Sequence, residues 1–285
     1  MKKTIRKKSK EKTEEWLSAG VIAKLTLVFL VVQIIGLFCA VQLANYGFAK
    51  GVIVDDVNDL QNSLYLFGMI ILTTGIVIIS LKLKKTRKLL LLFEILAIFS
   101  ATWIVFSCIF PTNNLLAIAL AIALVGAKQI KKEDTTIRTI ASVLATAGAG
   151  AFIGITLGLT PAIVFMTILA TYDIFAVYFT KHMISIGQEA KKNNFAFMVA
   201  LHSKKHDFEL GNGDLVMPLI ISSSIITNGP FTNNNLIAAL CLIASFIGLV
   251  ISIYWVAKKK NAMPALPPQS ALMLLIIIAA TALGA

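Results

Sequence analysis

Charged residues are scarce in this chain. They make up 14% of its 285 residues, whereas apolar residues make up 58%. This balance excludes an ordinary soluble domain and indicates a protein that crosses a membrane several times. The net charge of +12 does not indicate a nucleic-acid partner. The charges fall in short clusters between apolar runs, so anionic lipid headgroups and membrane topology explain them better.

The chain also has little of what metal and redox chemistry requires. Its three cysteines each stand alone in an apolar segment, which excludes a disulfide framework and a Cys-x-x-Cys metal site. His182, His202 and His206 lack the His-Glu-x-x-His spacing of zinc proteases. The sequence therefore predicts no metal and no cofactor, and it does not support a zinc protease or a rhomboid-like enzyme.

Nine apolar runs can be drawn along the chain. A helix that spans a bilayer needs about 20 residues, and most of the runs reach that length. The fourth is short and the seventh is interrupted by glycine and proline, so these two are the weakest candidates. The runs are Val21–Ala44, Ser63–Leu81, Leu89–Phe110, Asn114–Ala127, Ile140–Leu159, Pro161–Thr180, Leu210–Thr227, Leu236–Ala257 and Pro264–Leu283.

The basic residues predict the orientation. With the N-terminus in the cytosol, only Lys50 of the 26 lysines and arginines falls in an outer connection. Basic residues collect on the cytosolic side, so we expect an all-α polytopic protein with nine transmembrane helices and an outer C-terminus. The expected parts are a basic cytosolic tail over 1–16 and a membrane domain over 17–285, with a cytosolic loop over 181–207.

Two aspartates, Asp173 and Asp214, lie in neighbouring apolar runs. A carboxylate in a bilayer costs a few kcal/mol, so an intramembrane acid is a functional candidate. At a helical rise of about 1.5 Å per residue, both fall about 10–12 Å below the inner surface. The sequence shows no lysine or arginine in the apolar interior that would neutralise them, which disfavours a purely structural role.

The two acids alone leave two functions open. Two carboxyl groups within hydrogen-bond reach share one proton, and an aspartic peptidase uses such a pair as base and acid. A proton- or cation-coupled transporter or channel also uses buried acids as its ion site. The transporter hypothesis predicts internal repeats, and no clear repeat is visible.

Glycine and proline surround the acids. Gly211 and Gly213 precede Asp214, and glycine permits close approach and unusual dihedral angles. Pro218 has no N–H to donate to the carbonyl of Asp214, which weakens the helix at that acid. Three prolines between positions 264 and 268 predict an extended entry to the last run.

Three motifs resemble those of the presenilin and signal peptide peptidase family. They are Tyr172-Asp173, Gly211-Asn212-Gly213-Asp214 and Pro264-Ala265-Leu266, and their order and the nine-run plan also match. The chain is similar to a compact archaeal presenilin homologue. The resemblance implies an intramembrane aspartyl protease with Asp173 and Asp214 as its catalytic dyad. It also implies that Pro264, Ala265 and Leu266 shape the site and position substrate, and we expect supporting roles for Tyr172, Gly211 and Gly213.

The resemblance has consequences for partners. Its substrates would be transmembrane helices of membrane proteins in a lipid bilayer, cut in the cytosolic half. The loop over 181–207 is too short to hold the segment that presenilins cleave for activation, so we expect activity without self-processing or partner subunits. Asn212 is polar where an apolar residue is expected, which bears on specificity. A prepilin-peptidase-like enzyme shares Gly-x-Gly-Asp but not the other two motifs.

Three further features have simpler interpretations. Glu94 is expected to be a structural or interfacial acid. The apolar stretch Phe195–Leu201 is either interfacial or a strand that could pair with an unwound substrate. A stripe at a spacing of four residues predicts a close-packing face between helices and secondarily suggests a homo-oligomer. The stripe comprises Ser142, Thr146, Gly150, Gly154 and Gly158.

Overall fold

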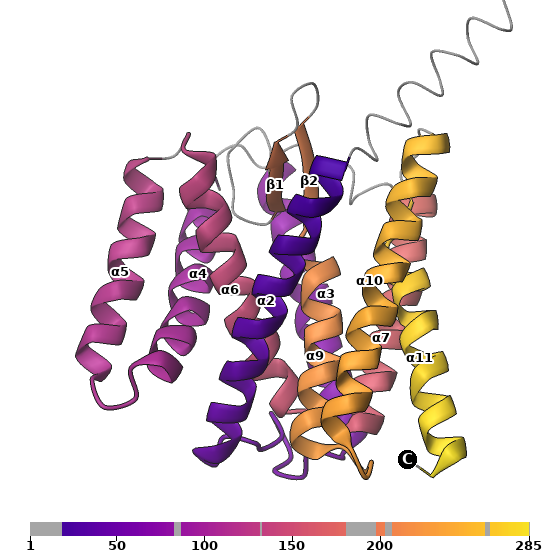
Figure 1. Cartoon of the computed structure of the whole chain (residues 1–285). Coiled ribbons are helices and arrows are strands. Elements are labelled where there is room, and N and C mark those ends of the chain that lie inside the picture. The colour runs from indigo at the N-terminus through magenta and orange to yellow at the C-terminus, as the bar shows by residue number, and fades with distance from the viewer. Residues whose placement is uncertain are drawn as a thin grey trace, which may run out of the picture.

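The computed structural model describes residues 19–82, 87–131, 133–180, 198–202, 207–259 and 263–284. The basic tail over 1–16 and most of the loop over 181–207 lie outside these ranges. The described helices stand side by side as a bundle (Figure 1). They are α2 (Ala19–Asn45), α3 (Leu60–Lys82), α4 (Arg87–Ile109), α5 (Asn114–Ile130), α6 (Thr135–Ile155), α7 (Leu159–Phe175) with the π-helical segment η2 (Ala176–Thr180), α9 (Gly213–Asn228), α10 (Asn234–Lys259) and α11 (Leu266–Leu283).

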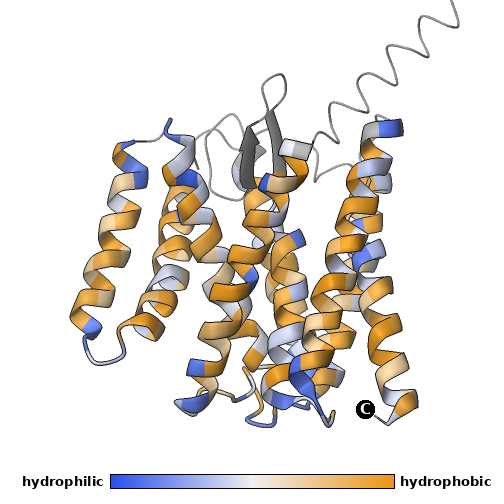
Figure 2. Cartoon of the chain, viewed as in Figure 1, coloured by the Kyte–Doolittle hydropathy of each residue, from blue (hydrophilic) through white to orange (hydrophobic). Residues whose placement is uncertain are grey.

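Each expected apolar run corresponds to one of these nine α-helices. Seven are long and apolar enough to cross a membrane. The two shorter ones, Asn114–Ile130 and Gly213–Asn228, correspond to the two weakest runs of the sequence. Apolar residues cover most of the length of the helices, and hydrophilic residues gather towards the two ends (Figure 2). The chain is thus a multi-pass membrane protein with a helical bundle.

The all-α expectation requires one correction. β1 (Met198–His202) and β2 (Asp207–Gly211) form an antiparallel hairpin in which Met198 pairs with Gly211. Polar and apolar residues alternate along β2, as a half-buried strand requires. The seventh helix therefore begins at Gly213 rather than Leu210. The depth expected for Asp214 from helical rise is wrong, because a strand rises about 3.3 Å per residue.

The apolar stretch Phe195–Leu201 lies only partly within the described chain. Residues 198–201 belong to β1, and residues 195–197 lie outside the described ranges. The strand pairs with β2 of the same chain. Pairing of this stretch with a substrate therefore has to involve the edge of an existing hairpin.

α9 lies in the interior of the bundle, in contact with α2, α6, α7 and α10. Most of its side chains over 215–225 are buried. The small-residue stripe of α6 is confirmed as a close-packing face. A Cβ added at Gly150 would lie 2.6 Å from Leu219, and one at Gly154 would lie 2.5 Å from Ser223. The stripe packs within the chain, and a homo-oligomer stays a prediction.

Two of the buried charges are paired. The Lys128 ammonium lies 2.5 Å from the Glu94 carboxylate, and their side chains are 5% and 0% exposed. This agrees with a structural role for Glu94, which joins α4 to α5. The partner of Lys128 is Glu94 and neither Asp173 nor Asp214. The helix α5 continues to Ile130 instead of ending at Ala127, so Lys128 is inside it.

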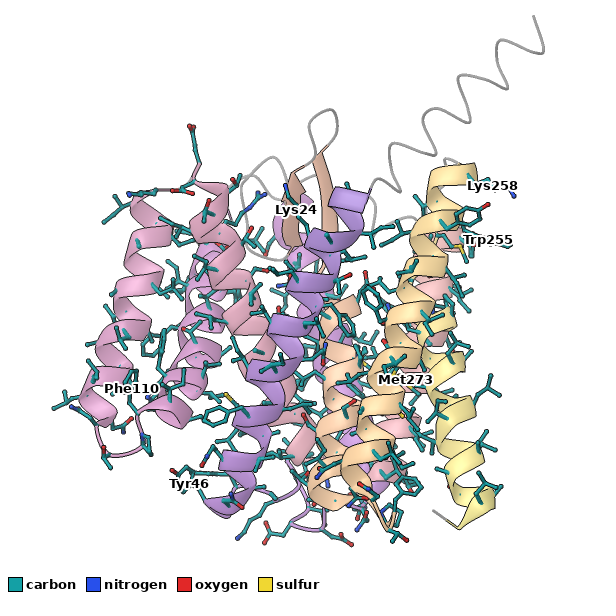
Figure 3. All side chains as sticks on the ribbon, in the orientation of Figure 1. Lys24, Tyr46, Phe110, Trp255, Lys258 and Met273 are labelled. Atoms are coloured by element: carbon teal, nitrogen blue, oxygen red, sulfur yellow. The ribbon has the colours of Figure 1, made fainter. Side chains whose placement is uncertain are left out.

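The two ends of the bundle differ in charge. Lys24 and Lys258 lie at one end, and Tyr46 and Phe110 lie at the other (Figure 3). The hairpin stands at the end that carries Lys24 (Figure 1). We call this the basic end. That it faces the cytosol stays a prediction.

Candidate active site

A largely apolar cavity of about 400 Å³ lies among α3, α6, α7, α9 and the start of α11. Most of its wall is aliphatic. Its polar lining comes from Thr73 and Thr74 of α3 together with Tyr172 and Asp173 of α7. An apolar cavity with a few convergent polar groups is typical of a binding or active site. It therefore gathers parts of all three sequence motifs, because Gly213 and Leu266 also line it.

Asp173 lies on the last turn of α7, and its residue is 6% exposed. Its carboxylate accepts a hydrogen bond from the backbone N–H of Leu266 at 3.3 Å. The backbone N–H of Ala265 also lies near this carboxylate and favours its charged form. Buried carboxylates are costly without such partners, so the start of α11 is what holds this acid in place.

The local sequence explains why α11 can do this. Ala265 is the N-cap and Leu266 the first residue of the helix. The first N–H groups of a helix have no partner inside it, and they attract negative charge. Pro267 and Pro268 have no N–H, and proline suits the start of a helix. The free donors are thus confined to Ala265 and Leu266. The resemblance implied that these residues shape the site. In the structure, the Leu266 N–H donates to the Asp173 carboxylate.

The helix geometry changes next to Asp173. α7 gives way at Ala176 to the π-helical segment η2. The Ala176 N–H donates to the carbonyls of both Tyr172 and Asp173. Short π segments interrupt α-helices frequently at functional sites. This change was not predicted, because no residue of Ala176–Thr180 is one that marks a π-helical segment in a sequence.

Asp214 is the second residue of α9 and is half-buried. A Cβ added at Gly211 would lie 3.6 Å from its carboxylate, and one at Gly213 would meet open space. Neither glycine has a positive φ, so neither uses the unusual dihedral angles that glycine permits. Their lack of side chains instead leaves room around the acid and opens it towards the cavity.

The two acids are brought together. Asp173 and Asp214 come from different helices and lie close enough for their charges to interact. Tyr172 also faces the cavity, and its ring packs edge-on against Phe67 of α3 at a centroid distance of 6.4 Å. Pro264 is buried at the entry to α11. Of the motif residues, Tyr172, Asp173, Gly213 and Leu266 line the cavity. The remaining motif residues lie within two positions of these along the chain.

No metal site accompanies these residues. Among the described residues, no group of three or more histidine, cysteine or acidic side chains could hold a metal ion. His182 and His206 lie outside the described ranges. The chemistry available at this site is that of two carboxyl groups, with Asp173 lining the cavity and Asp214 next to the lining residue Gly213.

Two residues near Asp214 were not predicted as part of the site. Gln33 of α2 donates a hydrogen bond to the carbonyl of Leu215 at 3.0 Å. Ser142 of α6 lies 2.7 Å from Asn212, with its hydroxyl donating to the side-chain carbonyl. Gln33 is an isolated polar residue in an apolar run, and this isolation could have indicated a buried hydrogen bond. For Ser142 the sequence predicted only close packing between helices.

A helical membrane bundle with two acids beside an apolar cavity is the arrangement expected of an intramembrane aspartic protease. Comparison with known proteins supports this class. The family model described as signal-peptide peptidase, presenilin aspartyl protease matches residues 26–282. The chain belongs to this family and is therefore an aspartic protease that cleaves within membranes. No curated protein matches the chain.

Solved structures show the same fold. One structure of a presenilin family intramembrane aspartate protease, in space group C222, has a TM-score of 0.69 and 24% identity. The match covers 92% of this chain and 99% of that one. A second, in space group P2, has a TM-score of 0.64 and 21% identity, and the match covers 94% of this chain and 98% of the other.

Proposed function

We propose that Asp173 and Asp214 form the catalytic dyad that hydrolyses peptide bonds in transmembrane helices. The observation that supports the proposal is that Asp173 lines an apolar cavity and that Asp214, on a separate helix, follows Gly213, which lines the same cavity. Asp173 has backbone donors that fix its carboxylate, and Asp214 has open space at Gly213. One acid is thus held rigidly while the other keeps access to the cavity.

Hydrolysis needs one ionised and one protonated carboxyl group. The carboxylate takes a proton from water as the water oxygen attacks the scissile carbonyl carbon. The carboxylic acid gives its proton to the carbonyl oxygen, forming a tetrahedral diol. Collapse of the diol breaks the C–N bond, and a proton passes to the leaving amine. The dyad returns to its starting charge with no cofactor.

The substrate proposed is a membrane-spanning helix. A cavity with a largely aliphatic lining suits apolar side chains. α3 forms one wall, and only 11% of its membrane-spanning part is buried, the smallest share among the candidate spans. A helix whose surface is mostly exposed to lipid is held by few neighbours, so we propose that substrate enters past α3.

The peptide bond must become accessible before it is cut. Backbone groups of a helix are paired with each other, and unwinding leaves them without partners in a dry site. Within the described chain, β2 pairs only with β1, and it ends at Gly211, three residues before Asp214. An unwound substrate segment could add to the free edge of β2, which would deliver its backbone close to the dyad.

The site is proposed to open towards the cytosol. The hairpin next to Asp214 stands at the basic end of the bundle (Figure 1), and basic residues collect on the cytosolic side. Water would then reach the dyad from the cytosol, and substrates would be cut in the cytosolic half of the membrane. The chain is proposed to act without partner subunits.

The test uses the purified full chain in liposomes with a single-pass helical substrate. We compare the wild type with Asp173→Asn, Asp214→Asn and a control, Asp56→Asn. Asp56 caps a loop turn with its side chain, and asparagine can make the same bond. We expect cleavage within the apolar span, located by mass spectrometry, for the wild type and the control only. Equal cleavage by the dyad variants would remove these acids from the mechanism.

A further inference from the structure

The first two turns of α9, which carry Asp214, are held from behind by two other helices. Their front faces the cavity through Gly213, Val216 and Met217. Their back contacts α2 and α6. The orientation of Asp214 therefore depends on the contacts of α9 with α2 and α6. None of the three sequence motifs includes residues of those two helices.

The first contact is a hydrogen bond to Asn212, the residue that precedes Gly213. The Ser142 hydroxyl donates to the Asn212 side-chain oxygen at 2.7 Å, and Ser142 is fully buried. Asparagine at an N-cap normally accepts a hydrogen bond from the first turn of its own helix. Asn212 makes no such side-chain cap in α9. Its carbonyl oxygen is directed to α6 instead, which ties the start of α9 to that helix.

The second contact is a hydrogen bond to Leu215, the residue that follows Asp214. Gln33 donates to the Leu215 carbonyl at 3.0 Å and is 2% exposed. Pro218 cannot donate to the Asp214 carbonyl, so the first turn of α9 lacks one of its own hydrogen bonds. The Gln33 bond adds a tie from α2 at the residue next to this missing bond. The side-chain oxygen of Gln33, Oε1, has no hydrogen-bond partner among the described residues.

Close packing sets the distance at which these bonds form. Leu219, one turn after Leu215, inserts between Gly36 of α2 and Gly150 of α6. A Cβ at Gly36 would lie 2.3 Å from Leu219, and one at Gly150 would lie 2.6 Å from it. These glycines let α2 and α6 approach α9 closely enough for Gln33 and Ser142 to reach it.

We propose that Ser142 and Gln33 are positioning residues that fix the rotation of α9 and so aim Asp214 at the cavity. This inference rests on the proposed role of Asp214 in the dyad. Ser142 acts on the residue two before Asp214 and Gln33 on the residue after it. Together they hold both sides of the acid. Loss of either bond lets the first turn of α9 rotate, which misplaces the carboxyl group without changing the cavity wall.

The test measures kcat and KM of the full chain in liposomes for Ser142→Ala and Gln33→Met. The control is Ser224→Ala, because Ser224 also ties α9 to a neighbouring segment, by a 2.8 Å bond to the Leu157 carbonyl, but near the far end of α9. We expect kcat to fall about 10- to 100-fold in the first two variants with KM unchanged, as for misplaced catalytic groups. Ser224→Ala should stay within about twofold of the wild type.

A double-variant measurement keeps the inference testable if a single variant folds poorly. Asn212→Leu removes the acceptor of the Ser142 bond, so adding Ser142→Ala to it should change kcat by less than about twofold. If Ser142→Ala costs as much in that background as in the wild type, Ser142 does not act through Asn212. Ser142→Ala, Gln33→Met and Ser224→Ala could instead lose kcat equally and in proportion to their loss of thermal stability. That result would show that all three residues have only structural roles.

The same assay separates this inference from the proposed function. Full activity of Asp214→Asn would overturn the dyad and the positioning roles with it. An inactive Asp214→Asn beside fully active Ser142→Ala and Gln33→Met would leave the dyad standing and overturn only the positioning roles.

Discussion

The Asp173 carboxylate accepts a hydrogen bond from the backbone N–H of Leu266, 93 residues further along the chain. This bond joins the end of α7 to the start of α11. It gives the Pro-Ala-Leu motif a physical function, because a helix start supplies unpaired N–H groups and the prolines that follow Leu266 supply none. The motif thus presents the Leu266 N–H to one buried acid, with the Ala265 N–H nearby.

Removing the Leu266 N–H should impair catalysis more than removing its side chain. Proline fits the first position of a helix, so Leu266→Pro deletes the donor while keeping the helix start. A hydrogen bond to a charged group contributes about 1.5–3 kcal/mol, which predicts a fall in kcat of about 10- to 100-fold. Leu266→Ala is the matched control, because it loses the side chain and keeps the N–H. Equal kcat values in the two variants would contradict a role for the donor.

The activity should require one protonated acid. If Asp173 and Asp214 share a proton, raising the pH through the second titration of the pair ionises both and removes the general acid. We therefore expect kcat to decline at high pH. The measurement is initial cleavage rate against pH in liposomes, with helix content followed by circular dichroism to show that the fold persists. A flat profile would count against a shared proton.

The helices were predicted well from the sequence, and candidate site residues could be named from it, because both rest on local signals. Long apolar runs gave the helices, and acids in such runs stood out by their cost. Contacts between distant segments were not predictable in the same way. Gln33 reaches Leu215 across 182 residues, and nothing local to either one indicates the other. A strand over Phe195–Leu201 was one of the two interpretations of that stretch, but its pairing with β2 was not predicted, because nothing local to either strand indicates the other.

Glycines of the bundle should differ in their tolerance of a methyl group. At Gly154 a Cβ would lie 2.5 Å from the Ser223 Cβ and 2.9 Å from the Ile220 carbonyl, so α6 and α9 must move apart. We expect Gly154→Ala to destabilise the protein by about 1–3 kcal/mol. Gly126→Ala is the control, because nothing lies within 4 Å of the new atom and alanine favours helix. Unfolding in detergent measures both, and equal stability would refute the packing argument.

The buried pair Glu94–Lys128 should behave as a unit. Lys128→Met leaves the Glu94 carboxylate buried without its ammonium partner, and such losses cost about 3–5 kcal/mol. The double variant Glu94→Leu, Lys128→Met removes both charges, and replacement of a buried ion pair by apolar residues is often neutral. We therefore expect the double variant to be more stable than Lys128→Met in detergent unfolding. It should also cleave substrate at the wild-type rate, because neither residue lines the cavity. A double variant that is stable but inactive would place the α4–α5 pair in the catalytic machinery after all.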